Sequence, residues 1–177
     1  PGSRQSEISL ILPEMLAATA IIKRHNPNLD FVLPAVPHLL PLIKSIVEGS
    51  GVTILDQPED LIPALQTSDA MIATSGTITL QAALCGTVGV TCYITGAFSG
   101  FIGRRVVDLD KAILPNAILG RPLYPFYFQE AATGKTLAAA TLDCLYDANA
   151  KSNARKAAVE LKSLLTGGAH SFDELVI

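Results

Sequence analysis

The 177-residue sequence has no tryptophan, only three cysteines and three histidines, and few charged side chains. Its formal charge of -3 provides no basic excess, so nucleic acid is not an expected partner. No apolar run approaches the roughly 18 residues of a membrane span, and the first residues lack the basic-then-apolar pattern of a signal peptide. The sequence therefore predicts neither a membrane-spanning helix nor a secretory leader.

The number and spacing of cysteine and histidine residues also limit which kinds of site are expected. Cys85, Cys92 and Cys144 are odd in number and show no CxxC spacing, so we expect buried free thiols, as suits a reducing cytosol. The histidines are scattered without the spacing of metal ligands. We therefore predict no metal site and no cofactor.

Hydrophobic residues make up 49% of the chain, which is enough for a substantial core in one domain. Short apolar runs alternate with longer segments of helical periodicity. The pattern predicts strands at 29–33, 51–56, 70–74 and 89–94, and helices at 5–25, 37–49, 56–66, 76–85, 97–108, 133–148 and 150–165. Such alternation is typical of a buried parallel sheet with helices on both faces. The fold class is therefore α/β, as one Rossmann-like domain over residues 1–177.

Local signals refine these boundaries. Pro13 is expected to kink the first helix or to begin a fresh turn. Asp56 is expected to cap the helix that follows it, with Glu59 three residues later as its capping-box partner. Residues 113–130 are rich in proline and are expected to form an irregular stretch.

In open α/β sheets, ligands bind where strands lead into helices at the carboxyl edge. Two such joins combine glycine with hydroxyl or basic side chains at a helix start, where free N–H groups favour an anion. They consist of Gly2, Ser3 and Arg4, and of Ser75, Gly76 and Thr77. The arginine could also clamp phosphate oxygens. Ordinary helix capping is the alternative for either join taken alone.

Several nucleotide and hydrolase motifs are excluded. The segment "ATGKT" at 132–136 resembles the end of a phosphate loop, but the first glycine of that motif would fall on Gln129. No GxGxxG and no GxSxG occurs, so neither a dinucleotide fingerprint nor a hydrolase elbow is predicted.

Three further arginines could reach an anion. Arg104 and Arg105 follow an apolar helix face, where they form either a solvated pair or a contact to a diphosphate or an anionic lipid surface. Arg121 lies with Asn116 in the proline-rich stretch, which we expect to frame a ligand. The aromatic residues Tyr124, Phe126, Tyr127 and Phe128 are expected in the core or in an interface, with contacts to acyl chains as the alternative.

Taken together, these segments resemble the C-terminal half of the lipid-A-disaccharide synthase family. The similar pieces, in order, are "PGSRQSEI", "LPEMLAA", "FVLPA", "SGTITLQAAL", "FIGRRVV", "ILPNAILGRPLYP" and the "FQ" at 128–129. They extend from residue 1 to about residue 145 in the order of the family.

The resemblance implies an inverting glycosyltransferase of the two-domain GT-B architecture that requires no metal. The family transfers the sugar of UDP-2,3-diacylglucosamine to 2,3-diacylglucosamine 1-phosphate, forming the lipid A disaccharide 1-phosphate and UDP. It implies a cytoplasmic protein peripheral to the inner membrane. A homodimer is compatible with the apolar loops.

In this architecture the C-terminal domain mainly holds the nucleotide of the donor. The resemblance therefore implies that both joins bind UDP, with Gln81, Asn116 and Gln129 lining the cleft. The acceptor-binding half, with the general base, is expected outside this chain, so we assign no catalytic residue here. We expect the chain alone to bind UDP weakly and to show no transferase activity.

Two residues depart from the family pattern. Gln81 stands where the family usually has glutamate, which in related transferases bonds the ribose, and an amide loses charge-assisted strength. Phe126 stands where the family tends to have an acidic residue. The alternatives are another UDP-sugar enzyme, such as a 2-epimerase or a transferase acting on a lipid-linked muropeptide, and a non-catalytic assembly module that dimerises through its aromatic loop.

Overall fold

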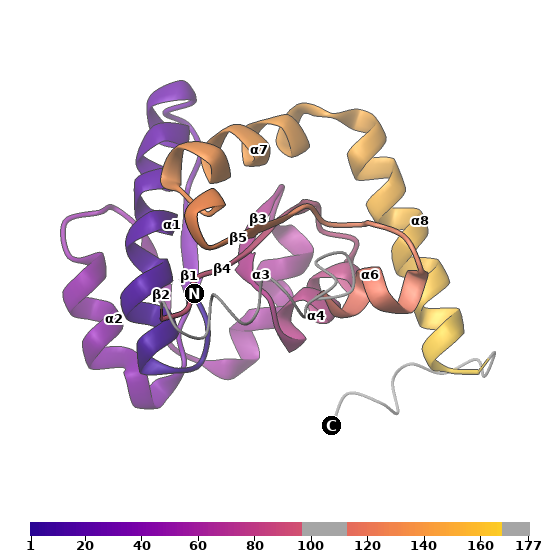
Figure 1. Ribbon diagram of the computed structural model, residues 1–177, viewed down its shortest axis with the longest axis horizontal. Coiled ribbons are helices and arrows are strands. Elements are labelled where there is room, and N and C mark those ends of the chain that lie inside the picture. The colour runs from indigo at the N-terminus through magenta and orange to yellow at the C-terminus, as the bar shows by residue number, and fades with distance from the viewer. Residues whose placement is uncertain (97–112, 168–177) are drawn as a thin grey trace.

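The computed structural model describes residues 1–96 and 113–167, in which parallel strands are flanked by helices (Figure 1). One sheet pairs β1 (Val32–Pro34) with β2 (Thr53–Leu55), and the other has the order β3 (Met71–Thr74), β4 (Gly89–Tyr93), β5 (Phe126–Phe128). All pairs are parallel. The predicted α/β class is confirmed, although the strands lie in two sheets.

The helices follow most of the predicted segments. They are α1 (Gln5–His25), α2 (Leu40–Val47), α3 (Leu61–Thr67), α4 (Thr77–Cys85), α6 (Leu114–Leu119), α7 (Gly134–Tyr146) and α8 (Ala148–Leu165). Single 3-10 turns occupy Pro37–Leu39, Pro58–Asp60 and Gln129–Ala131. Figure 1 shows α1 and α2 at one end of the molecule and α8 at the other. The helix predicted at 97–108 lies outside the described residues.

Side-chain alternation explains why the central sheet is covered on both faces. Val90 and Cys92 of β4 are two residues apart and pack with α1 and α7 in one core cluster. Met71 of β3 and Phe126 of β5 belong to a second cluster, formed with side chains of α4, α6 and α8. A third cluster joins Leu33 of β1 to α1 and α2. Helix α1 therefore contributes to the cores over both sheets.

Helix α1 is the one described helix whose length and composition would allow it to cross a membrane. Its apolar face is largely used inside the protein, because Ile8, Ile11, Leu12 and Ile22 are almost fully buried. The core helix of a globular domain meets the same test of length and composition. The packing identifies α1 as such a core helix, and it runs through Pro13 without beginning anew.

The start of α7 lies tightly against α1 and explains the "ATGKT" segment. A Cβ added at Gly134 would lie 2.5 Å from the Cβ of Ala17, so only glycine permits this approach. The Gly134 N–H donates to Glu14 Oε2 over 2.6 Å, and Thr133 Oγ1 caps the Thr136 N–H. The segment is a helix cap at a helix–helix contact.

The prediction that Asp56 caps a helix with Glu59 is wrong. A 3-10 turn comes first, α3 begins at Leu61, and Asp56 Oδ1 accepts instead from Gln57 Nε2. The reason is Pro63, which has no N–H and is best tolerated in the first turn of an α-helix. Starting α3 at Leu61 places Pro63 in that turn.

The expectation of an irregular stretch at 113–130 is also wrong. Helix α6 begins with a proline near its start and ends at Gly120, whose φ of 65° is left-handed. Strand β5 then joins the sheet beside β4. Both elements are shorter than the windows of sequence over which a helical or strand period can be recognised.

Candidate functional site

The carboxyl ends of β3, β4 and β5 lie together at one edge of the central sheet. Thr74 pairs with Cys92, and Tyr93 pairs with Phe128, so the residues that follow these strands are neighbours in space. This edge is where an open parallel sheet binds its ligands. We call it the carboxyl edge.

The turn Ser75–Thr77 leaves β3 at this edge and leads directly into α4. The Ser75 N–H donates to Cys92 O over 3.1 Å, which fixes the turn against β4. Gly76 and Thr77 are exposed, and Gln81 lies one turn further along α4, also exposed. As at any helix start, the N–H groups of Thr77 and Ile78 have no helical partner, and within the described residues no other acceptor meets them. The turn can accept an anion.

The predicted join of Gly2, Ser3 and Arg4 reaches the same edge through Glu7. Tyr93, the last residue of β4, donates its hydroxyl proton to Glu7 Oε1 over 3.1 Å. Glu7 lies in the first turn of α1, three residues after Arg4. The structure therefore brings both predicted joins to consecutive residues of β4, Cys92 and Tyr93.

The join of Gly2, Ser3 and Arg4 has fewer free backbone N–H groups than predicted. Glu7 Oε2 accepts from the Ser3 N–H at 3.0 Å and from the Arg4 N–H at 3.2 Å. Two N–H groups that were predicted to meet a phosphate are thus already bonded to a carboxylate. The guanidinium of Arg4, with a side chain 74% exposed, remains accessible as a donor at this join.

These contacts shift the acidity of the groups involved. Burial raises the pKa of Glu7, but hydrogen bonds from Ser3, Arg4 and Tyr93 outweigh it and hold the pKa below its ordinary value of 4.5. Burial and the hydrogen bond to Glu7 together raise the pKa of Tyr93. The carboxylate is therefore charged, and the phenol is neutral, at physiological pH.

The lowered pKa of Glu7 predicts a specific pH dependence of stability. The contribution of this carboxylate is present above pH 4.5 and is lost as the pH falls through its folded-state pKa. The unfolding free energy of the unmodified chain should therefore fall more steeply below pH 4.5 than that of the Glu7→Gln variant. Urea unfolding between pH 3 and 7 measures this, and parallel curves would contradict it.

Gln129 follows β5 at the same edge, but its amide is used within the protein. It is 8% exposed and has a φ of 53°, which is unusual for a residue with a side chain. Its Oε1 accepts from the Thr95 N–H at 3.0 Å, and its Nε2 donates to Thr95 O at 3.1 Å. Gln129 thereby fixes the backbone that leaves β4.

Asn116 and Arg121 are not brought to the carboxyl edge. Asn116 is 3% exposed and holds the turn before β5, and the Tyr124 hydroxyl in that turn donates to Thr87 O. Arg121 pairs with Glu160 and lines a cavity of about 470 Å³ beside Val88 and Gly89. Both therefore lie toward the amino ends of the strands. Arg104 and Arg105 lie outside the described residues.

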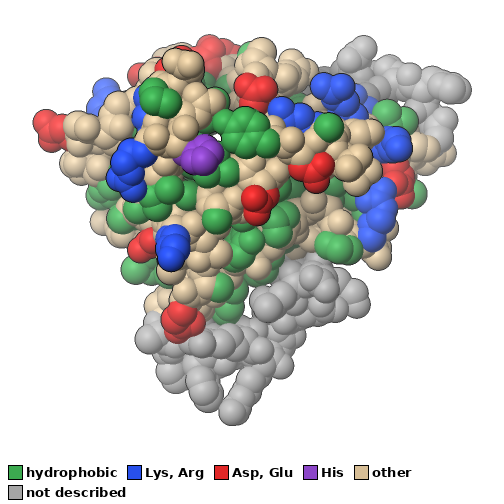
Figure 2. Space-filling view, turned by 90° about the horizontal axis from the view of Figure 1, so that it is seen from above, with side chains coloured by type: hydrophobic (Ala, Val, Ile, Leu, Met, Phe, Trp, Pro, Cys, Tyr) green, Lys and Arg blue, Asp and Glu red, His purple; other side chains and the backbone are tan. Residues whose placement is uncertain are grey.

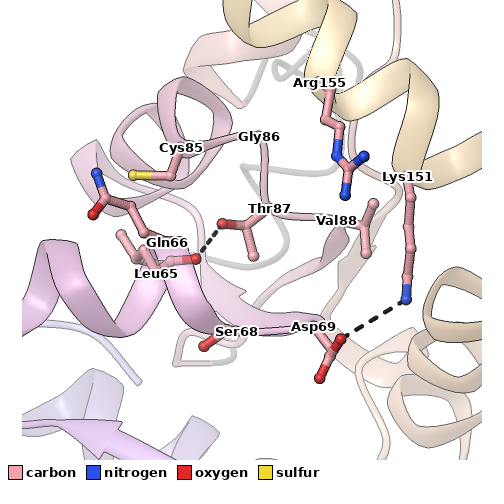
Figure 3. Close-up of a pocket in the computed structure, with 10 residues that line it drawn as sticks. All are labelled: Leu65, Gln66, Ser68, Asp69, Cys85, Gly86, Thr87, Val88, Lys151 and Arg155. Atoms are coloured by element: carbon pink, nitrogen blue, oxygen red, sulfur yellow. Dashed lines mark hydrogen bonds and ion pairs between the residues drawn. The ribbon is translucent and has the colours of Figure 1, made fainter.

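A smaller pocket of about 150 Å³ also opens at the amino ends, between α3, α4 and α8 (Figure 3). Lys151 and Arg155 reach over it from α8, and Lys151 approaches Asp69 at 3.9 Å. The Thr87 hydroxyl donates to Leu65 O across its floor. None of the predicted site residues that the structure describes lines this pocket.

The remaining sequence predictions concern metals and thiols. Within residues 1–96 and 113–167, no three His, Cys, Asp or Glu side chains gather as a metal site would require. All three cysteines are free; Cys92 is buried, and burial raises its pKa to about 12, whereas Cys85 and Cys144 are half-buried.

On the face of the molecule shown in Figure 2, the side chains of Lys and Arg are interspersed with those of Asp and Glu.

The parallel strands, the helices on both faces and the strand-to-helix turns at the carboxyl edge define a Rossmann-like α/β domain. Comparison with known proteins then identifies the family. The model of the lipid-A-disaccharide synthetase family matches residues 1–176, and the chain belongs to that family.

Curated relatives support this assignment. The chain is similar to proteins named lipid-A-disaccharide synthase from Paraburkholderia phytofirmans, at 40% identity over 83% of this chain and 38% of the relative, and from Rhodopseudomonas palustris, at 31% identity over 97% of this chain and 44% of the relative. A third, from Burkholderia lata, is 39% identical over 83% of this chain and 38% of the relative. The chain thus spans about four tenths of the length of these relatives.

Proposed function

We propose that this chain is the donor-binding part of an inverting glycosyltransferase of lipid A biosynthesis. The complete enzyme would transfer the sugar of UDP-2,3-diacylglucosamine to 2,3-diacylglucosamine 1-phosphate, releasing UDP. It would work in the cytoplasm against the inner membrane face, and a homodimer would suit it. The observation that carries the proposal is the meeting of the Ser75–Thr77 turn and Arg4 at the end of β4, in a chain of this family.

The chemistry of the site suits this role. As the sugar leaves, negative charge develops on the UDP diphosphate and must be stabilised. The N–H groups at the start of α4, at the positive end of its dipole, and the Arg4 guanidinium supply fixed donors for that charge. Gln81 shares an exposed face with Thr77, four residues away, and could bond a ribose hydroxyl there.

Binding of UDP tests this proposal. Because Gln81 replaces a carboxylate, we expect weak binding, with a Kd of about 0.1–1 mM. UDP at about ten times its Kd should add about 1.4 kcal/mol to stability and raise Tm by about 3–6 °C. Uridine lacks the diphosphate and should give no shift at the same concentration. An unchanged Tm at 10 mM UDP would refute the donor-binding role.

The acyl chains offer a second comparison. A domain that binds a diacylated donor should bind UDP-2,3-diacylglucosamine more tightly than UDP-N-acetylglucosamine, because apolar chains add buried area. Equal affinities would favour another UDP-sugar enzyme, such as a 2-epimerase. Calorimetry at donor concentrations below micelle formation measures the difference.

A further inference from the structure

Glu7 is a buried carboxylate at the start of α1, in the position that an anionic ligand would otherwise take. Its side chain is 9% exposed and accepts four hydrogen bonds within the protein. Oε2 accepts from the Ser3 and Arg4 N–H groups, and Oε1 accepts from Arg4 Nη1 at 2.7 Å and from the Tyr93 hydroxyl at 3.1 Å. Both oxygens are therefore fully engaged.

This arrangement holds Arg4 at two points. Its backbone N–H is bonded to one oxygen of Glu7, and its guanidinium is bonded to the other. A guanidinium has five N–H donors, so the bond through Nη1 leaves the rest of the fork to a ligand. An arginine that is 74% exposed would otherwise sample many rotamers, and ordering it would cost free energy on binding.

Tyr93 fixes the carboxylate against the sheet. It is the last residue of β4 and pairs with Phe128, so its position is set by the strand register. Its hydroxyl bonds the same Glu7 oxygen that Arg4 Nη1 bonds. The chain of contacts from β4 through Tyr93 and Glu7 ends at Arg4.

Gly2 is the residue that makes room for this carboxylate. A Cβ added there would lie 2.5 Å from Glu7 Oε2 and 2.9 Å from Glu7 Cβ. The φ of Gly2 is 109°, a conformation that other residues rarely adopt. The glycine of this turn therefore serves an internal carboxylate.

We propose that Glu7 is a positioning residue of the donor site, which holds Arg4 so that its guanidinium meets the diphosphate of the donor. This inference rests on the proposed binding of UDP at the carboxyl edge. It assigns the two parts of the site different roles: the α4 turn offers backbone N–H groups, and the α1 turn offers an arginine held in place by a carboxylate.

The Glu7→Gln variant tests the proposal, since it keeps the size of the side chain. An amide has one acceptor oxygen, so its NH2 group must face either Arg4 Nη1 or the backbone N–H groups, and one set of bonds is lost. We expect UDP to bind on the order of tenfold more weakly. The control Glu48→Gln makes the same charge change at an exposed residue after α2 and should leave the Kd unchanged.

A double-mutant cycle separates positioning from general stability. If Glu7 acts through Arg4, the Arg4→Ala variant should weaken UDP binding, and adding Glu7→Gln to it should weaken binding no further. Additive losses would overturn the proposal. The NMR signals of the Tyr93 ring should also titrate at a lower pH in Glu7→Gln than in the unmodified chain.

The outcomes distinguish the two claims. If the unmodified chain binds no UDP, the proposed function fails and this inference fails with it. If it binds UDP and Glu7→Gln binds equally well, only the positioning role is overturned. Should Glu7→Gln not fold, Tyr93→Phe removes one bond to the carboxylate and is expected to weaken UDP binding about threefold. An unchanged Kd in that variant would also overturn the inference.

Discussion

Replacing Asn116 with alanine is expected to destabilise the protein by about 3–5 kcal/mol. Its Oδ1 accepts from the N–H groups of Leu123 and Tyr124, and its Nδ2 donates to Tyr124 O. The residue is 3% exposed, so alanine would leave these three backbone groups without partners in the interior. Urea unfolding with linear extrapolation measures the change.

Asn153→Ala is the matched control, because Asn153 is exposed on α8. We expect that substitution to change the unfolding free energy by no more than about 0.5 kcal/mol. A cost below about 1 kcal/mol for Asn116→Ala would show that the turn before β5 is held by other contacts. Any loss of UDP binding in Asn116→Ala must be measured on folded protein, since the expected effect is on stability.

Replacing Gly89 with alanine is expected to destabilise the protein by about 3 kcal/mol. Gly89 opens β4 directly opposite Met71, and a Cβ added there would lie 2.3 Å from Met71 O and 2.5 Å from Met71 Cγ. The added methyl group would force the two strands apart. The hydrogen bond from the Met71 N–H to Val88 O, at 2.9 Å beside this position, holds them together. Thermal and urea unfolding measure the loss.

Gly76→Ala is the control for this prediction. Within the described part of the chain, nothing lies within 4 Å of a Cβ added at Gly76, and its φ of 164° is extended backbone that any residue adopts. Its unfolding free energy should stay within about 0.5 kcal/mol of that of the unmodified chain. If Gly89→Ala were equally mild, the register that places Ser75 beside Cys92 would not depend on this close approach.

The strand-to-helix unit around Ser75 could be predicted because every local signal agrees. Residues 71–74 are an apolar run, small residues follow, and Thr77–Cys85 ends at Gly86 in the left-handed conformation. Strand β5 could not be predicted, because three residues carry no measurable period. Its place in the sheet depends on pairing with β4, and nothing in the sequence of residues 126–128 indicates that partner.

From the sequence we predicted an anion site at Gly2–Arg4, but we did not predict that the Glu7 carboxylate occupies part of it. A signal was present, because Glu7 stands three residues after the N-cap Arg4, the spacing of a capping box. Its partner Tyr93 is 86 residues away and could not be inferred from spacing. The roles of Asn116 and Gln129 within the protein likewise depend on contacts across turns that only the fold creates.

Residue-resolved NMR during a UDP titration tests the central claim most directly. If the carboxyl edge binds the nucleotide of the donor, saturable shifts should gather at the amides of 75–78 and at the Arg4 side chain. The amides around Lys151 and Arg155, at the amino ends of the strands, should not move. Shifts confined to that opposite edge, or none at 10 mM UDP, would contradict the assignment of this chain as a donor-binding domain.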